Sequence, residues 1–204
     1  KNWLDKMERR FGRYAIRNLT MYLLAGYAIG YLLSFTMPQL LTYFTLEPAL
    51  ILKGQVWRLL SWVIIPPNDN IIFVIFMMLL YYSLGNTLES YWGAFRYNVY
   101  IFSGILFTVI GAFIVNGLIG GITGFGSLYS TYYINMSIFL ACASIMPDYQ
   151  LLLYGIIPIK MKWLAILDVV LLAVDAVQGG LIIRIVIIAS LLNFIIFFFC
   201  NRNL

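Results

Sequence analysis

The strongest constraint on this chain is its succession of apolar segments, which are too numerous and too long for a soluble core. The segments lie at about 19–36, 70–88, 97–117, 127–146, 163–177 and 181–199. A membrane-spanning helix needs about 20 mostly apolar residues. Of the 204 residues, 63% are hydrophobic and only 10% are charged, which is too little polar surface for a soluble protein. The sequence therefore predicts one all-α membrane domain with six transmembrane helices.

The stretch before the first apolar segment has a different pattern. Apolar side chains recur there every three or four residues, with Leu4 beside them and basic residues mostly between them: Trp3, Met7, Phe11 and Tyr14. This periodicity predicts an amphipathic interfacial helix over residues 1–18, followed by a membrane domain over 19–204. The basic residues beside a membrane favour contact with anionic lipids rather than nucleic acid, and no nucleic-acid partner is expected.

The connections between the segments are unusual as well. Residues 37–69 are too apolar for an ordinary loop and are broken by prolines, which predicts short amphipathic helices in or near the membrane interface. A glycine-rich stretch over residues 117–126 is expected to form an extracytoplasmic loop. Residues 149–162 are predicted to form a short strand-like or re-entrant segment.

The basic residues also predict the orientation in the membrane. If the N-terminus is inside and the chain crosses six times, the outer segments carry Lys53, Arg58 and Arg184. The inner segments then carry ten: Lys1, Lys6, Arg9, Arg10, Arg13, Arg17, Arg96, Lys160, Lys162 and Arg202. Because cytoplasmic loops are enriched in Lys and Arg, both termini are predicted to be cytoplasmic.

The chain contains no histidine. This removes the usual general base at neutral pH and the imidazole metal ligand, so Ser–His and Cys–His dyads are excluded. The two cysteines, Cys142 and Cys200, lie in different apolar segments and form no metal-binding or disulfide pattern. No metal or cofactor is expected.

Three motifs suggest a family. Gly54-Gln55-Val56-Trp57-Arg58-Leu59-Leu60-Ser61 lies in the first connection, Gly85 to Gly93 with Glu89 ends the second apolar segment, and Pro147 follows the fourth. These segments resemble the G-Q-x-W-R-L-x-T/S, G-x-x-x-E-x-x-x-G and proline features of the rhomboid superfamily, which contains intramembrane serine proteases and non-proteolytic derlins. The resemblance implies a six-helix scaffold whose motif residues are Gly54, Gln55, Trp57, Arg58, Gly85, Glu89, Gly93 and Pro147. The residues of these motifs also resemble a bacterial, chiefly firmicute, branch of rhomboid-like proteins, so a location in a bacterial plasma membrane is expected.

The catalytic residues of that family have no counterpart here. Phe73 and Met77 stand where the resemblance implies a His and an Asn, no Gly-x-Ser-Gly occurs, and residues 181–199 lack the base histidine. A Ser–Lys dyad is the alternative. However, Lys160 and Lys162 are predicted on the side opposite to the candidate nucleophiles Ser130, Thr131 and Ser137. The resemblance therefore implies a pseudoprotease rather than an enzyme.

Four polar residues fall within the predicted spans: Asn135, Ser137, Asn193 and Asp168. Intramembrane polar residues are candidates for function. Asn135 and Asn193 either form interhelical hydrogen bonds or line a hydrophilic pocket that binds part of a client helix. Asp168 either ionises in a wet cavity or pairs with a lysine. Arg58 and Glu89 are expected to stabilise the fold.

These observations leave three hypotheses for function. The first is a rhomboid-like pseudoprotease that binds transmembrane segments of client proteins in quality control, chaperoning or adaptor roles. The second is an active intramembrane serine-type protease with a different set of catalytic residues. The third is a small transporter or channel, although the chain has no internal repeat and few charges in its spans.

Overall fold

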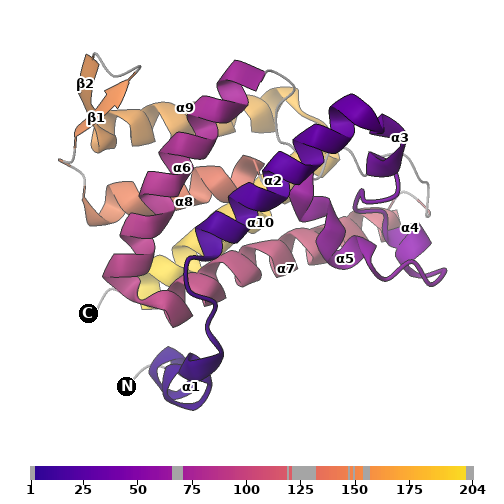
Figure 1. The fold of residues 1–204 in the computed structure, drawn as a ribbon, viewed down its shortest axis with the longest axis horizontal. Coiled ribbons are helices and arrows are strands. Elements are labelled where there is room, and N and C mark those ends of the chain that lie inside the picture. Colours follow the sequence, from indigo (N-terminus) through magenta and orange to yellow (C-terminus); the bar gives the residue numbers. More distant parts are fainter. Residues whose placement is uncertain are drawn as a thin grey trace.

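The computed structural model describes residues 3–65, 71–118, 120, 132–146, 148, 150–153 and 157–200. It shows long helices packed side by side, with a small two-stranded sheet at one edge and a short N-terminal helix near one end of the bundle (Figure 1). The long helices are α2 (Leu19–Thr36), α6 (Ile71–Trp92), α7 (Ala94–Leu118), α8 (Tyr132–Ile145), α9 (Met161–Gln178) and α10 (Leu181–Cys200).

These helices correspond to the six apolar segments of the sequence. The first has the predicted bounds, because Asn18 and Pro38 flank its apolar run. The second continues past the predicted end at residue 88 to Trp92, where Gly93 stops it with a φ of 88°. Only glycine adopts such a conformation readily. A single residue therefore separates α6 from α7.

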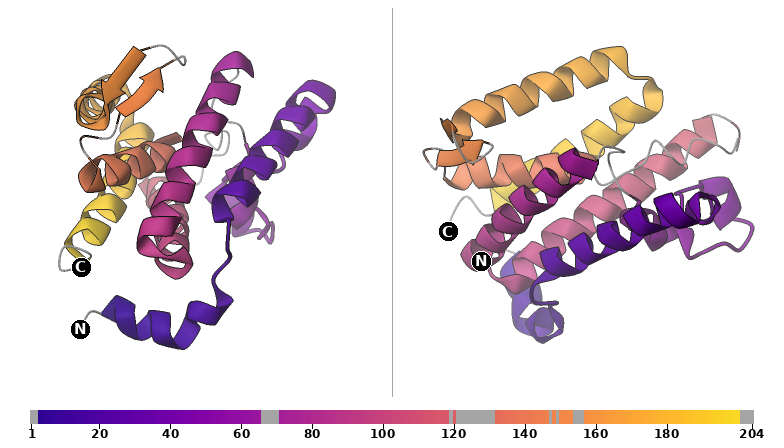
Figure 2. Two further views of the ribbon diagram at one scale, coloured as in Figure 1. Left: turned by 60° about the vertical axis from the view of Figure 1, so that its left-hand side comes forward. Right: turned by 45° about the horizontal axis from the view of Figure 1, so that its top comes forward.

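The N-terminal segment differs from the predicted continuous helix. Helix α1 covers Trp3–Phe11 and a 3-10 turn, η1, covers Gly12–Tyr14, after which the chain runs in extended form towards α2. Gly12 weakens the helix, and Asn18 has a left-handed φ of 57° just before α2 begins. Figure 2 shows α1 below the end of the bundle in its left view, where it contacts α7.

The connection between α2 and α6 contains the short helices that its sequence predicts. These are α3 (Pro38–Leu41), α4 (Pro48–Ile51), α5 (Arg58–Ser61) and the 3-10 turn η2 (Trp62–Ile64). Pro38 and Pro48 each begin a helix, where a missing backbone N–H is harmless. This connection packs against α2 through η2 and against α7 through α4.

The predicted strand-like piece is a β-hairpin. Strand β1 (Gln150–Leu153) pairs antiparallel with β2 (Ile157–Lys160), with Gln150 opposite Lys160. Strand β2 leads directly into α9.

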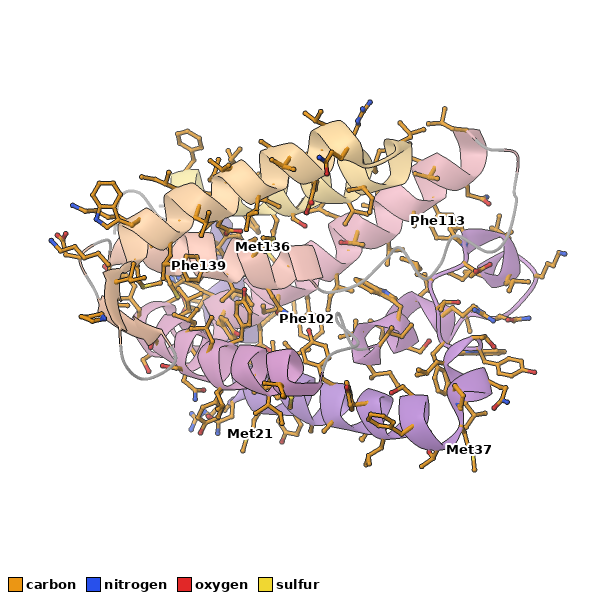
Figure 3. All side chains as sticks on the ribbon, turned by 90° about the horizontal axis from the view of Figure 1, so that it is seen from above. Met21, Met37, Phe102, Phe113, Met136 and Phe139 are labelled. Atoms are coloured by element: carbon orange, nitrogen blue, oxygen red, sulfur yellow. The ribbon has the colours of Figure 1, made fainter. Side chains whose placement is uncertain are left out.

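Helix α8 lies at the centre of the bundle. Every residue from Ile134 to Ala143 is buried, and α8 packs against α6, α9, α10 and, more lightly, α7. A helix that is buried on all sides is a core element. Helix α9 is the opposite case, since its buried residues are Met161, Asp168 and Leu172. Figure 3 shows side chains of α9 projecting outward along the edge of the molecule.

Two of the described helices, α2 and α7, are long and apolar enough to cross a membrane by length and composition. Shorter apolar stretches lie in α8 (Ile134–Ile145) and α10 (Ile183–Phe197). The predicted number of six crossings therefore stays a prediction.

Candidate functional site

Tyr100 is the centre of a buried polar junction between three helices. Its hydroxyl donates a hydrogen bond to the backbone oxygen of Ser137 across 2.9 Å, which joins α7 to α8. Its own backbone oxygen accepts a hydrogen bond from Nδ2 of Asn193, also across 2.9 Å, which joins α7 to α10. The rings of Trp92 and Phe197 lie against the Tyr100 ring, with centroids 5.3 and 5.0 Å away. The junction thus fixes one end of α6 and α10 on α7.

Two of the candidate polar residues lie on α8. Asn135 donates from Nδ2 to the Tyr27 hydroxyl across 3.4 Å, a long contact that connects α8 to α2. The Ser137 hydroxyl donates to the backbone oxygen of Ile134 in its own helix across 2.7 Å. Ser137 is 2% exposed. Its contact with another helix is therefore made by its backbone rather than by its side chain.

Asp168 occupies a different position. It is buried on α9, and its Oδ2 atom has no hydrogen-bond partner among the described residues. Lys160 and Lys162 both contact Asp148, at 3.8 and 3.7 Å, so pairing of Asp168 with a lysine stays one of its two predicted alternatives. Oδ1 of Asn193 is a second buried acceptor that is left unpaired within the same described ranges. Such atoms are rare in folded proteins and call for an explanation.

The four candidate residues are therefore only partly brought together. Asn193 and Ser137 both bind Tyr100, whereas Asn135 binds Tyr27. No hydrogen bond within the described structure joins Asp168 to the other three. Both asparagines make the interhelical contacts that were one of their two alternatives, and the sequence did not indicate their tyrosine partners.

The first motif forms a compact turn around Arg58. This residue is 3% exposed, and its guanidinium donates to Oε1 of Gln55 at 2.8 Å and to the backbone oxygens of Thr42 and Thr45 at 3.1 and 2.9 Å. Gly54 has a φ of 108°, a conformation that side chains rarely tolerate. Beside it, Trp57 donates from Nε1 to the Tyr43 backbone oxygen across 2.9 Å. The motif thus holds the connection between α2 and α6 in one shape.

The second motif lies where α2, α6 and α7 meet. Gly85 lies against a buried hydrogen bond of 2.6 Å between the Thr20 and Tyr97 hydroxyls. A Cβ atom at Gly85 would overlap the Thr20 side chain and lie 2.7 Å from the Tyr97 hydroxyl oxygen. Glu89 accepts a hydrogen bond from the backbone N–H of Asn18 across 2.8 Å. These motif residues position helices rather than expose reactive groups. Pro147, Ser130 and Thr131 lie outside the described residues.

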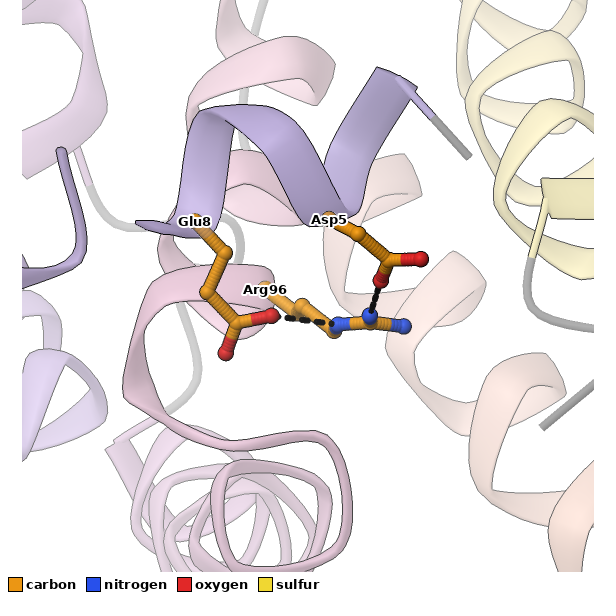
Figure 4. A network of polar contacts seen from close by, with 3 residues as sticks. All are labelled: Asp5, Glu8 and Arg96. Carbon is orange, nitrogen blue, oxygen red and sulfur yellow. Dashed lines mark hydrogen bonds and ion pairs between the residues drawn. The ribbon is translucent and has the colours of Figure 1, made fainter. Parts of the chain in front are cut away.

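A polar cluster that the sequence analysis missed connects α1 to α7. Arg96 is buried at the start of α7 and forms ion pairs with Asp5 and with Glu8, the latter at 3.1 Å (Figure 4). We call these three residues the Arg96 ion-pair cluster. Nearby, Asn98 accepts a hydrogen bond from the Ile16 N–H at 3.0 Å and donates to its carbonyl oxygen at 2.7 Å. The sequence feature that could have indicated this cluster is the pair Asp5 and Glu8, two acidic residues three positions apart in an otherwise basic helix.

The bundle of apolar helices, with its central α8 and its buried interhelical polar contacts, defines a helical membrane protein. The family model described as eukaryotic integral membrane protein (DUF1751) matches residues 17–200, and the chain belongs to this family. No curated protein and no solved structure matched the chain. The expected bacterial plasma membrane is not supported, because this family is described as eukaryotic. The description mentions neither rhomboids nor proteolysis, so that resemblance stays a prediction.

Proposed function

We propose that this protein is a non-catalytic, rhomboid-like membrane protein that binds transmembrane segments of client proteins in quality control, chaperoning or adaptor roles. The observation that carries the proposal is the attachment of α9. This helix meets the bundle through a narrow stripe that includes Asp168, whose Oδ2 atom is buried without a partner among the described residues.

The remaining surface of α9 is exposed and apolar. Its exposed large side chains are Trp163, Ile166, Leu167, Val169, Val170, Leu171, Val174 and Val177. In a membrane such a face contacts lipid or another helix. A client helix that carries a hydroxyl, amide or amino group gains a hydrogen-bond acceptor if α9 shifts enough to expose Asp168. Because hydrocarbon offers no other partner, this contact favours polar client segments.

A catalytic role is less well supported by the same residues. The Ser137 hydroxyl is buried and bonded to its own helix, and Lys160 of β2 and Lys162 of α9 both contact Asp148. A nucleophile requires a base within hydrogen-bond reach. For this reason we favour binding over proteolysis.

Site-specific photo-crosslinking in native membranes tests client binding. A photoreactive residue at Leu167 or Val170 of α9, which are 53% and 51% exposed, is compared with one at Leu32 or Phe35 of α2, which are 65% and 67% exposed. We expect α9 positions to capture a set of membrane proteins that α2 positions do not. Asp168→Asn, which keeps the size and removes the charge, is expected to change that set. Capture of lipid alone, or the same proteins at both helices, overturns the proposal.

We also propose six membrane crossings with both termini on the cytoplasmic side. The apolar helices and the basic segment around α1 support this orientation. Single cysteines at Arg10 and Lys53 are tested with a membrane-impermeant thiol reagent on sealed vesicles of known orientation. Labelling of both positions from the same side contradicts the proposed topology.

A further inference from the structure

Helix α1 has three distinct sides. One side faces the bundle and carries Leu4, which is fully buried, with Asp5 and Glu8. A second side carries Trp3, Met7 and Phe11, which recur every four residues and are 50%, 38% and 42% exposed. The third side carries the exposed cations Lys6, Arg9 and Arg10. The described chain thus leaves an apolar stripe beside a cationic stripe uncovered.

The acidic and basic side chains of this segment lie on different sides, because the acidic ones pair with Arg96. Between residues 3 and 18 the only acidic side chains are Asp5 and Glu8, and both pair with Arg96. The basic side chains of the same segment are all exposed: Lys6, Arg9, Arg10, Arg13 and Arg17. Arg96 pairs with both carboxylates, whose side chains are 30% and 39% exposed, so the more exposed charges of the segment are the positive ones.

Three further hydrogen bonds attach the chain between η1 and α2 to the bundle. Asn98 binds both backbone groups of Ile16, and Glu89 accepts from the Asn18 N–H. These contacts hold the segment against the α6–α7 corner (Figure 4 shows the ion-pair part of this attachment). The apolar stripe therefore has a defined place at one end of the helical bundle.

We propose that α1 and η1 bind an anionic phospholipid surface and that Arg96 sets the strength of this binding. The apolar stripe enters the headgroup boundary, and the five cations contact lipid phosphates. Arg96 is a positioning residue: it does not touch lipid, but it prevents Asp5 and Glu8 from repelling phosphate. This surface is separate from α9, so the inference goes beyond client binding.

The first test measures lipid preference directly. The full chain is reconstituted into mixed phosphatidylcholine and phosphatidylglycerol vesicles, extracted, and analysed by native mass spectrometry for retained lipid. Replacing Lys6, Arg9 and Arg10 by Gln is expected to lower the phosphatidylglycerol preference by about fivefold per charge at low salt. The matched control replaces Lys53, Lys160 and Lys162 by Gln, which removes the same charge elsewhere. The difference between the two variants is expected to shrink as salt increases.

The second test separates the charge effect of Arg96 from a structural one. Arg96→Gln frees two carboxylates and is expected to lower the preference for phosphatidylglycerol. Adding Asp5→Asn and Glu8→Gln to that variant removes the freed charges and is expected to restore the preference, although the ion pairs stay broken.

Two outcomes overturn the proposal. In the first, the two cation variants lower the phosphatidylglycerol preference equally, which means that the preference depends on net charge alone. In the second, the triple variant at Asp5, Glu8 and Arg96 binds phosphatidylglycerol as weakly as Arg96→Gln does, which means that Arg96 has a purely structural role. Photo-crosslinking at α9 is independent of both results, so failure here leaves the client-binding proposal standing.

Discussion

The side-chain amide of Asn193 donates a hydrogen bond to the backbone oxygen of Tyr100, so the last helix of the bundle is fastened to α7 by a polar contact inside an apolar core. The side chain is 1% exposed, while its own Oδ1 has no partner in the described part of the chain. The contact therefore stabilises the bundle, although the Oδ1 acceptor of Asn193 stays unpaired among the described residues.

Replacing Asn193 by Ala is expected to lower the stability of the bundle by about 1–2 kcal/mol, because a buried interhelical bond and its packing are lost. Reversible unfolding in mixed micelles measures the change. Ile188→Ala on the same helix, at a position 56% exposed, serves as the control and is expected to have a small effect. Equal losses in the two variants contradict the role given to Asn193.

Replacing Gly85 by Ala is expected to destabilise the α2–α6–α7 junction by about 1–3 kcal/mol, since the added methyl group overlaps Thr20 and crowds Tyr97. Thermal unfolding of the purified protein reports the loss. Gly117→Ala in α7 meets no atom of the described residues within 4 Å and is expected to be neutral or slightly stabilising. If both variants have the same thermal stability, close packing is not the reason why a glycine is needed at position 85.

Replacing Gly54 by Ala tests backbone strain without a packing change. Apart from its chain neighbours, no described residue has an atom within 4 Å of the added methyl group, but the φ of 108° disfavours any side chain. The expected loss is about 1–3 kcal/mol. Gly180→Ala, which is equally open and for which no positive φ is recorded, is the matched variant and should be tolerated. A tolerated Gly54→Ala would show that the turn readjusts.

Replacing Arg58 by Ala removes a buried guanidinium that donates hydrogen bonds to the carbonyl oxygens of Thr42 and Thr45. A loss of about 3 kcal/mol and faster protease cleavage within residues 37–65 are expected. Lysine keeps the charge but not the planar set of donors, so Arg58→Lys should recover only part of the stability. Lys53→Ala is the nearby exposed control, and cleavage as fast as in Arg58→Ala would argue against this role.

The sequence predicted the helical elements well because apolar runs in this chain end at strong signals. The bounds of α2 follow from its flanking residues, and the hairpin before α9 appears where a strand-like piece was expected. The end of α6 was missed because the polar residues Glu89 and Ser90 follow the apolar run, although both are compatible with a helix. The interruption of the N-terminal helix at Gly12 was missed for a related reason, since its apolar periodicity continues to Tyr14.

The candidate sites were predicted less completely. Polar residues inside apolar segments are visible in a sequence, which is why Asn135, Asn193 and Asp168 were found. Their partners were not visible, because Tyr27 and Tyr100 are ordinary aromatic residues until the helices are packed. The Arg96 ion-pair cluster joins positions 91 and 88 residues apart, and local spacing carries almost no information about such contacts.

The enclosure of α8 has a consequence for how the chain is made. Two of the neighbours that surround this helix, α9 and α10, follow it in the sequence and leave the ribosome after it. During synthesis, part of the surface of α8 therefore stays uncovered until α9 and α10 have been made. The burial of α8 is therefore complete only when both α9 and α10 have joined the bundle.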